Sequence, residues 1–171
     1  MIQTTLRRIL PLMPPENVFV VTGQRYVDLA REQLPELPVE NIIGEISGKN
    51  TAPAIALGAL HIARSDPSAT IAVLTADHLI PAEDTFRAAL LAAKSVAKQG
   101  KLVTLGITPT GPETGYGYIH RGEVLNQNAY RVRQFLEKPN RETAQRFFDS
   151  GEYYWNSGMF IWQLPTSTPN T

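Results

Sequence analysis

The sequence has 171 residues, 43% of them hydrophobic, which is enough for one domain with a sizeable core. Its 16 Lys and Arg residues balance 16 Asp and Glu residues without blocks of like charge, which argues against a nucleic-acid partner or an anionic membrane. There is no Cys, so disulfides and Cys-based metal sites are excluded, and no apolar run resembles a signal peptide or a membrane span. We therefore expect a soluble, cytoplasmic protein.

Helices and strands alternate in the first 107 residues, as judged from apolar periodicity and from the positions of Pro and Gly. Helices are predicted at residues 4–12, 26–34, 52–64 and 82–99, and strands at residues 18–21, 41–43, 70–74 and 101–107. In the first helix, Arg7 and Arg8 are expected on the solvent face. In the last, Phe86, Leu90 and Ala93 are expected to face the core. This alternation predicts the α/β class, with a doubly wound, mostly parallel sheet.

The pattern changes after residue 107. Residues 108–118 are rich in Pro, Gly and Thr and are predicted to form a loop, followed by a strand at residues 130–135 and a helix at residues 141–150. We interpret this half as α+β insertions over the ligand edge of the sheet. We expect one domain over residues 1–164 and a disordered tail at residues 165–171.

An acid follows the most apolar of the predicted strands. Residues 70–74 are rich in β-branched and apolar side chains without polar alternation, which is typical of a strand buried on both faces. Asp77 comes next, where its carboxylate needs solvent or a partner, and ligands of open α/β sheets bind at this edge. The alternative is that Asp77 only caps the helix that follows Pro81.

A loop with a lysine precedes the predicted helix at residues 52–64. The backbone N–H groups of a helix N-terminus, together with Lys49, suit an anion or a nucleotide. The spacing is not that of a Walker A loop, because Gly44 and Gly48 are one residue too close and Asn50 replaces the Ser or Thr. The alternative is a simple turn in which Asn50 or Thr51 caps the helix.

The second half of the chain also contains polar residues and a glycine that are candidates for ligand binding. Glu137 and Lys138 end a predicted strand before Pro139. A lysine suits a phosphate, and a glutamate carboxylate accepts hydrogen bonds from sugar hydroxyls. The alternative is a solvated charge pair without a ligand. Asn156 lies among aromatic residues and needs a partner, which a ligand hydroxyl or the backbone could supply. Gly117 permits close approach of the backbone or makes a tight turn. The three histidines show no metal-ligand spacing and are expected to be structural.

Taken in order, five of these stretches resemble the mannose-1-phosphate guanylyltransferases, a family of sugar-phosphate nucleotidyltransferases. The matching stretches are residues 45–54 (EISGKNTAPA), 76–78 (ADH), 112–119 (PETGYGYI), 135–139 (FLEKP) and 155–160 (WNSGMF). The resemblance runs from about residue 3 to about residue 162. It implies an incomplete Rossmann-like fold of the nucleotide-diphospho-sugar transferase type, with GTP and mannose 1-phosphate as substrates and Mg²⁺ as cofactor.

The resemblance also implies roles for individual residues. Asp77 would hold the catalytic Mg²⁺, and Lys138 would meet the sugar phosphate. The residues expected at the guanine end are Gly48, Lys49, Asn50 and Thr51. The residues expected to contact mannose are Gly117, Glu137 and Asn156.

Two parts of the family pattern have no counterpart in the sequence. These are the N-terminal Gly-rich loop with its Arg, which cradles the triphosphate, and a second metal-binding acid near the end of the domain. The chain therefore resembles the middle of an enzyme. We expect it to be inactive alone, with exposed strand edges that favour self-association or a complementing fragment. The alternative functions are another sugar-1-phosphate nucleotidyltransferase, such as a glucose-1-phosphate thymidylyltransferase, and a non-catalytic paralogue that binds a sugar nucleotide or a partner subunit.

Overall fold

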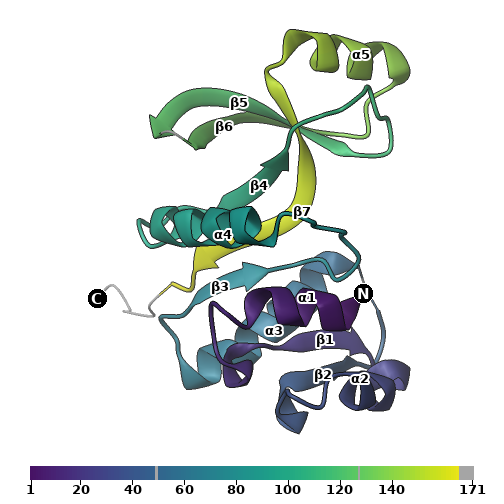
Figure 1. Cartoon of the computed structure of the whole chain (residues 1–171), viewed down its shortest axis with the longest axis vertical. Coiled ribbons are helices and arrows are strands. Elements are labelled where there is room, and N and C mark those ends of the chain that lie inside the picture. Colours follow the sequence, from purple (N-terminus) through teal and green to yellow (C-terminus); the bar gives the residue numbers. More distant parts are fainter. Residues whose placement is uncertain (49, 127, 166–171) are drawn as a thin grey trace. The chain divides into compact units, whose positions relative to one another are not determined.

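A computed structural model of the chain describes residues 1–48, 50–126 and 128–165 (Figure 1). Lys49 and residues 166–171 of the predicted tail lie outside the described residues. The chain separates into two compact units. Unit 1 comprises Met1–Val103 and the segment from Ile161 onward, and unit 2 comprises Thr104–Phe160.

Unit 1 contains all of the helices and strands that the sequence predicts for it, with small shifts at their ends. The helices are α1 (Ile2–Ile9), α2 (Val27–Gln33), α3 (Thr51–Ser65) and α4 (Glu83–Ala97), and the strands are β1 (Val20–Gly23), β2 (Ile42–Glu45) and β3 (Thr70–Val73). Gly100, with a left-handed φ of 75°, follows the end of α4 as predicted. Short 3-10 turns at Pro15–Asn17, Gln24–Tyr26 and Val39–Asn41 connect these elements.

The strands of unit 1 do not form one continuous sheet. β1 and β2 are parallel, with Val20 opposite Ile42. β3 pairs instead with β7 (Tyr153–Gln163), and just beyond β7 the Leu164 N–H donates to the Ala69 carbonyl at 2.8 Å. Figure 1 shows β3 on the opposite side of β1 from β2, yet no ladder joins β1 to β3 within the described residues. The parallel sheet expected from the sequence is therefore interrupted between these two strands.

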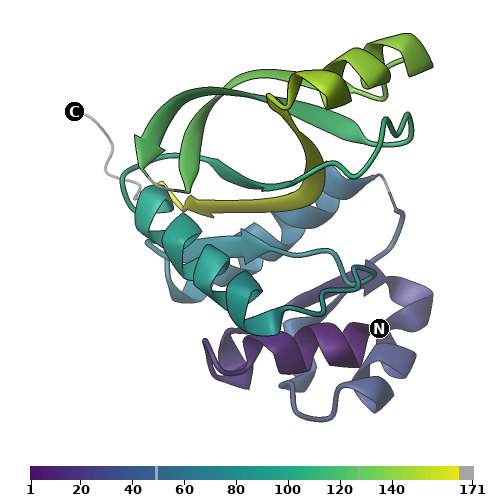
Figure 2. The same cartoon turned by 45° about the horizontal axis from the view of Figure 1, so that its top comes forward.

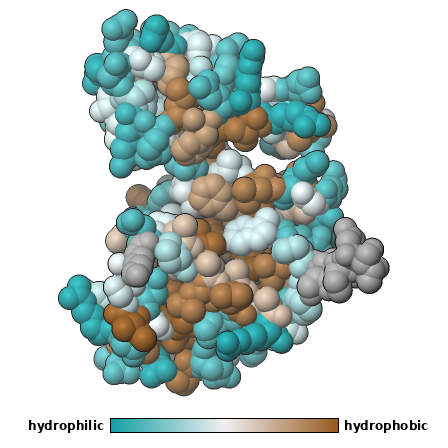
Figure 3. Space-filling view, turned by 180° about the vertical axis from the view of Figure 1, so that it is seen from behind, coloured by the Kyte–Doolittle hydropathy of each residue, from teal (hydrophilic) through white to brown (hydrophobic). Residues whose placement is uncertain are grey.

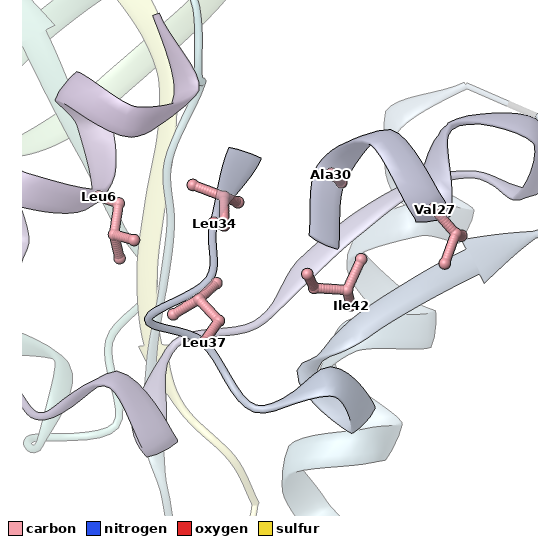
Figure 4. Close-up of a cluster of buried hydrophobic side chains, with 6 residues drawn as sticks. All are labelled: Leu6, Val27, Ala30, Leu34, Leu37 and Ile42. Carbon is pink, nitrogen blue, oxygen red and sulfur yellow. The ribbon is translucent and has the colours of Figure 1, made fainter. Parts of the chain in front are cut away.

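The core of unit 1 is an aliphatic cluster contributed by α1, α2, β2 and the loop between α2 and β2 (Figure 4). Its members are Leu6, Val27, Ala30, Leu34, Leu37 and Ile42. The predicted inner face of α4 is also confirmed, since Phe86, Leu90 and Ala93 are all buried. Burial of such side chains is the main force that holds short helices to a sheet.

Two predictions about burial in unit 1 are wrong. Arg8 is only 2% exposed, because its guanidinium lies 5.8 Å from the centre of the Phe86 ring and its Nε lies 3.8 Å from the Glu83 carboxylate, both on α4. In β3 only Ile71 is buried, and Ala72 is exposed. An apolar strand is buried on both sides only if neighbouring elements cover it, and one edge of β3 has no partner strand in the described part of the chain.

Unit 2 is built around antiparallel strands. It contains β4 (Val103–Ile107) except for its first residue, β5 (Gly117–Asn126), β6 (Ala129–Glu137), α5 (Arg141–Ser150) and most of β7. β5 pairs with both β6 and β7, and β4 pairs with β7; Figure 2 shows the long curved hairpin of β5 and β6. The helix at residues 141–150 is confirmed, and the predicted strand at residues 130–135 forms the middle of β6. β5 and β7 were not predicted as strands, and the end of β4 is exposed rather than buried.

Both units mix helices with strands, which confirms the predicted α/β class with an incomplete, Rossmann-like parallel part. Among the described residues, no helix has the length and apolar character needed to cross a bilayer.

Candidate functional site

Three predicted site residues from different strands converge on one face of the unit 2 sheet. Gly117, the first residue of β5, lies opposite Glu137 at the end of β6. A Cβ atom on Gly117 would lie 2.7 Å from Glu137 Oε2 and 3.5 Å from the Cβ of Asn156 on β7. Because Gly117 has no side chain, the carboxylate of Glu137 can lie against the backbone there, next to Asn156.

The side chain of Asn156 is held through its oxygen. Its Oδ1 accepts a hydrogen bond from the Gly158 N–H at 3.2 Å and another from the Thr104 hydroxyl on β4, also at 3.2 Å. The contact with the Gly158 N–H, two residues further on, is that of an Asx turn, and Gly158 itself has a left-handed φ of 72°, which glycine adopts readily. Asn156 Nδ2 makes no hydrogen bond within the described residues, so its two N–H groups remain available to a ligand.

Thr104 was not predicted as a site residue. A threonine in a strand is an ordinary occurrence, and its β-branched side chain favours strands whatever its hydroxyl does. Only the pairing of β4 with β7 brings this hydroxyl to Asn156. The sequence therefore carried no signal that would have identified it.

Glu137 and Lys138 form an exposed pair at the end of β6. Lys138 Nζ lies 3.9 Å from Glu137 Oε1, and both side chains are more than half exposed, so their attraction contributes at most about 1 kcal/mol to stability. The backbone of Lys138 has a left-handed φ of 43°, and its N–H donates to the Tyr116 carbonyl at 3.2 Å. Such a conformation costs a non-glycine residue about 1–3 kcal/mol, and strain of this kind is concentrated at functional sites.

The chemistry of this face suits a polyhydroxylated ligand. Glu137 offers a carboxylate that accepts hydrogen bonds, and Asn156 offers an amide that donates them. One hydroxyl of a ligand can therefore donate to Glu137 while the oxygen of a neighbouring hydroxyl accepts from Asn156. Phe135, which is 48% exposed, adds an apolar surface beside Gly117.

Asp77 lies in unit 1, in an exposed turn after β3. It does not cap the following helix, because the N-cap of α4 is Ala82 and the acids of the first turn are Glu83 and Asp84. The capping alternative for Asp77 is therefore wrong. Its carboxylate makes no hydrogen bond or ion pair in the part of the chain that the structure describes, and it is not part of a cluster of three metal-ligating side chains there. A single carboxylate fits Mg²⁺ when water and ligand phosphates supply the other oxygens.

The predicted nucleotide loop also lies in unit 1. Gly48, Asn50 and Thr51 are exposed at the N-terminus of α3, whose first-turn N–H groups form the positive end of the helix dipole. Asn50 occupies the N-cap position, but its side chain makes no capping hydrogen bond and its φ is 69°. Unit 1 thus carries the residues predicted for metal and nucleotide, and unit 2 carries those predicted for the sugar.

Unit 2 has a separate hollow of about 750 Å³ along the hairpin of β5 and β6, lined in part by Arg121, Gly122 and Arg133. No predicted site residue lines it. His120, also in its wall, lies 3.3 Å from the Glu152 carboxylate and stacks on an aromatic ring, which agrees with the structural role expected for the histidines.

The family model for nucleotidyl transferases matches residues 1–170. The chain belongs to the nucleotidyl transferase family. Among the relatives of this nucleotidyl transferase chain, a mannose-1-phosphate guanylyltransferase of Escherichia coli (strain K12) is 51% identical over 171 residues, covering 95% of this chain and 36% of the relative. A mannose-1-phosphate guanylyltransferase of Salmonella montevideo is 48% identical with the same coverage. The chain thus spans about a third of the length of these relatives.

Two solved structures are similar to the chain over most of its length. A Thermus thermophilus protein described as a mannose-1-phosphate geranyltransferase matches with a TM-score of 0.86 and 34% identity, over 95% of this chain and 47% of its own. A Helicobacter pylori protein described as a mannose-6-phosphate isomerase matches with a TM-score of 0.80 and 33% identity, over 95% of this chain and 61% of its own.

Proposed function

We propose that the protein carrying this chain transfers a guanylyl group from GTP to α-D-mannose 1-phosphate, giving GDP-mannose and pyrophosphate. The observation that carries the proposal is the convergence of Gly117, Glu137 and Asn156, because a carboxylate beside a carboxamide donor suits two neighbouring hydroxyls of a sugar. The 51% identity to a mannose-1-phosphate guanylyltransferase supports this choice of sugar and nucleotide.

In the proposed reaction, a phosphate oxygen of mannose 1-phosphate attacks the α-phosphorus of GTP. The bond from that phosphorus to the bridging β-phosphate oxygen breaks, and pyrophosphate leaves with the electron pair. No covalent enzyme intermediate is needed, so the protein contributes mainly positioning and electrostatic stabilisation. We assign to Lys138 the role of supplying positive charge for the sugar phosphate. The guanine end of the nucleotide is assigned to Gly48, Lys49, Asn50 and Thr51.

Asp77 is the residue that we propose as the protein ligand of Mg²⁺. Its exposed carboxylate leaves the remaining coordination positions to water and phosphate oxygens, which is how proteins usually bind this ion. When bound, Mg²⁺ would neutralise negative charge on the reacting phosphates.

The first test replaces Asp77 with Asn in the longest natural protein that carries this chain. Turnover should fall by about 100-fold or more, because one charged ligand of the metal is lost, while the melting temperature stays near that of the parent. Asp28→Asn is the matched control, since the Asp28 side chain is 98% exposed and lies on α2. Near-normal turnover of Asp77→Asn at saturating Mg²⁺ would rule out the metal role.

The second test concerns the sugar phosphate. Lys138→Ala should raise the KM for mannose 1-phosphate more than the KM for GTP, because the phosphate loses a charged partner. Lys101→Ala, at an exposed position outside the proposed site, is the control. If Lys138→Ala changes neither KM nor turnover, Lys138 does not bind the phosphate.

Substrate profiling decides between the proposed reaction and its alternatives. Pyrophosphate release is measured with GTP, dTTP and UTP, each combined with mannose 1-phosphate or glucose 1-phosphate. A clear preference for dTTP and glucose 1-phosphate would replace guanylyl transfer with thymidylyl transfer. Binding of a sugar nucleotide without pyrophosphate release from any pair would favour the non-catalytic alternative.

A further inference from the structure

We propose that Thr104 is a positioning residue, whose hydroxyl orients the Asn156 side chain so that its NH₂ group faces the sugar. The inference rests on the proposed function, because it assigns a second residue to the same site. The proposed function concerns a reaction, whereas this inference concerns the orientation of the Asn156 amide in the free protein. It can therefore be tested without any substrate.

The hydrogen bond from Gly158 sets the orientation of the Asn156 amide. A backbone N–H can only donate, so the Asn156 atom that lies 3.2 Å from it must be the oxygen. With Oδ1 held there, Nδ2 occupies the other branch of the carboxamide. One hydrogen bond alone leaves the Asn156 amide some freedom to rotate, because the terminal torsion of asparagine has broad energy minima.

The Thr104 hydroxyl supplies the second contact to the same oxygen. Its Oγ1 lies 3.2 Å from Asn156 Oδ1 and 3.1 Å from the Met159 carbonyl oxygen. Both neighbours are acceptors, so the hydroxyl acts as a donor and its one hydrogen is shared between them. Rotating the amide by half a turn would place Nδ2 against the Gly158 N–H, with donor facing donor. Two donors from two different chain segments therefore favour one orientation of Asn156.

This orientation matters because of what lies next to Asn156. Glu137 and Asn156 flank Gly117, and the Glu137 carboxylate already provides acceptors on that face. If Asn156 presented its oxygen instead, the side chains of Glu137 and Asn156 would both offer acceptors, and a ligand hydroxyl oxygen would find no donor from Asn156. The Thr104 hydroxyl thus keeps the face mixed, with an acceptor from Glu137 and a donor from Asn156.

The test compares Thr104→Val with Thr104→Ser in the full 171-residue chain. Valine keeps the β-branched shape and removes the hydroxyl, whereas serine keeps the hydroxyl and removes a methyl group. The first measurement is the ¹H–¹⁵N spectrum of the Asn156 side-chain NH₂ group without ligand. We expect Thr104→Val to shift or broaden this pair of signals and Thr104→Ser to leave them near their original positions. Unchanged signals in Thr104→Val would overturn the proposal.

The second measurement is the affinity for mannose 1-phosphate by titration calorimetry. Thr104→Val should weaken binding by about three- to tenfold, the usual effect of losing one neutral hydrogen bond, and Thr104→Ser should have a smaller effect. In an Asn156→Ala background, Thr104→Val should cause no further loss, because its effect passes through Asn156. An equal further loss in that background would overturn the positioning role.

The two proposals fail in different ways. If Asn156→Ala leaves the affinity for mannose 1-phosphate unchanged, the proposed sugar site is wrong, and the spectrum of Asn156 still decides the role of Thr104. If Asn156→Ala weakens binding and Thr104→Val does not, the sugar site stands and the positioning role is wrong.

Discussion

At Gly117, a hydrogen atom in place of a side chain leaves room for the Glu137 carboxylate. A Cβ atom there would lie 2.7 Å from Glu137 Oε2 and 3.0 Å from Phe135 Cζ, so Gly117→Ala must displace both side chains. Both contacts involve the ends of half-exposed side chains that can move, so we expect a change in stability below about 1 kcal/mol and a clear loss of affinity for mannose 1-phosphate.

The control for Gly117→Ala is Gly115→Ala. A Cβ atom on Gly115 would have no neighbour within 4 Å, and its φ lies outside the left-handed region. Calorimetric titration and thermal unfolding of both variants give the comparison. If the two variants lose affinity equally, the close approach of the Glu137 carboxylate to the Gly117 backbone is not required for binding.

Backbone strain at Lys138 gives a second prediction at this scale. Lys138→Ala and Lys138→Gly both remove the ammonium group, but only glycine adopts a φ of 43° without cost. The free energy of unfolding should therefore be about 1 kcal/mol higher for Lys138→Gly than for Lys138→Ala, as measured by urea denaturation. An equal or lower value for Lys138→Gly would mean that the left-handed conformation is not strained in the folded protein.

At the scale of single elements, α5 shows how local signals define a helix. The side chain of Asn140 accepts a hydrogen bond from the Thr143 N–H at 2.9 Å, and Gly151 ends the helix with a left-handed φ of 66°. Asn140→Ala should lower the free energy of unfolding by about 1 kcal/mol, because an N–H group of the first turn loses its acceptor. Gln145→Ala, on the exposed surface of α5, should change it by less than about 0.5 kcal/mol in the same denaturation experiment. Equal effects would show that the cap is not what holds the N-terminus of α5.

The two strands that the sequence did not predict, β5 and β7, lack such local signals. β7 contains Asn156, Ser157 and Gly158, a triplet typical of turns, yet pairing with β4 and β5 keeps these residues within a strand. β5 follows a Gly-rich and Pro-rich stretch, and its side chains lack the regular apolar alternation of a half-buried strand. Propensity was overridden in both cases by tertiary pairing, which a single sequence does not reveal.

The same limit applies to the candidate site and to Arg8. Residue type and family resemblance were enough to propose Gly117, Glu137 and Asn156 one by one. Their convergence depends on the register between β5, β6 and β7, which the sequence did not predict. Arg8 was assigned to solvent by its charge, but its long stem packs against α4 beside Glu83.

At the scale of the whole molecule, α3 and the interrupted sheet leave apolar surface uncovered in unit 1. Gly58, which packs against Val21 of β1, is the one residue of the described part of α3 that is buried, and Leu60 is 64% exposed. Figure 3, seen from the side of α3, shows apolar side chains gathered over this part of the chain. A helix that is apolar on most sides is normally covered on those sides by protein. β1 and β3 also each present an edge without a partner strand in the described ranges.

Open strand edges beside apolar surface favour association with other chains. We therefore expect the 171-residue chain to form oligomers whose size grows with concentration, measured by size-exclusion chromatography with light scattering. Ala72→Lys places a charge at an exposed position of β3 and should shift the distribution toward monomer, because a lysine at an open edge opposes strand pairing. Leu102→Lys is the control, since it removes an exposed apolar side chain that lies outside β1 and β3. A chain that stays monomeric at every concentration, or equal suppression by both variants, would show that these strand edges do not drive association.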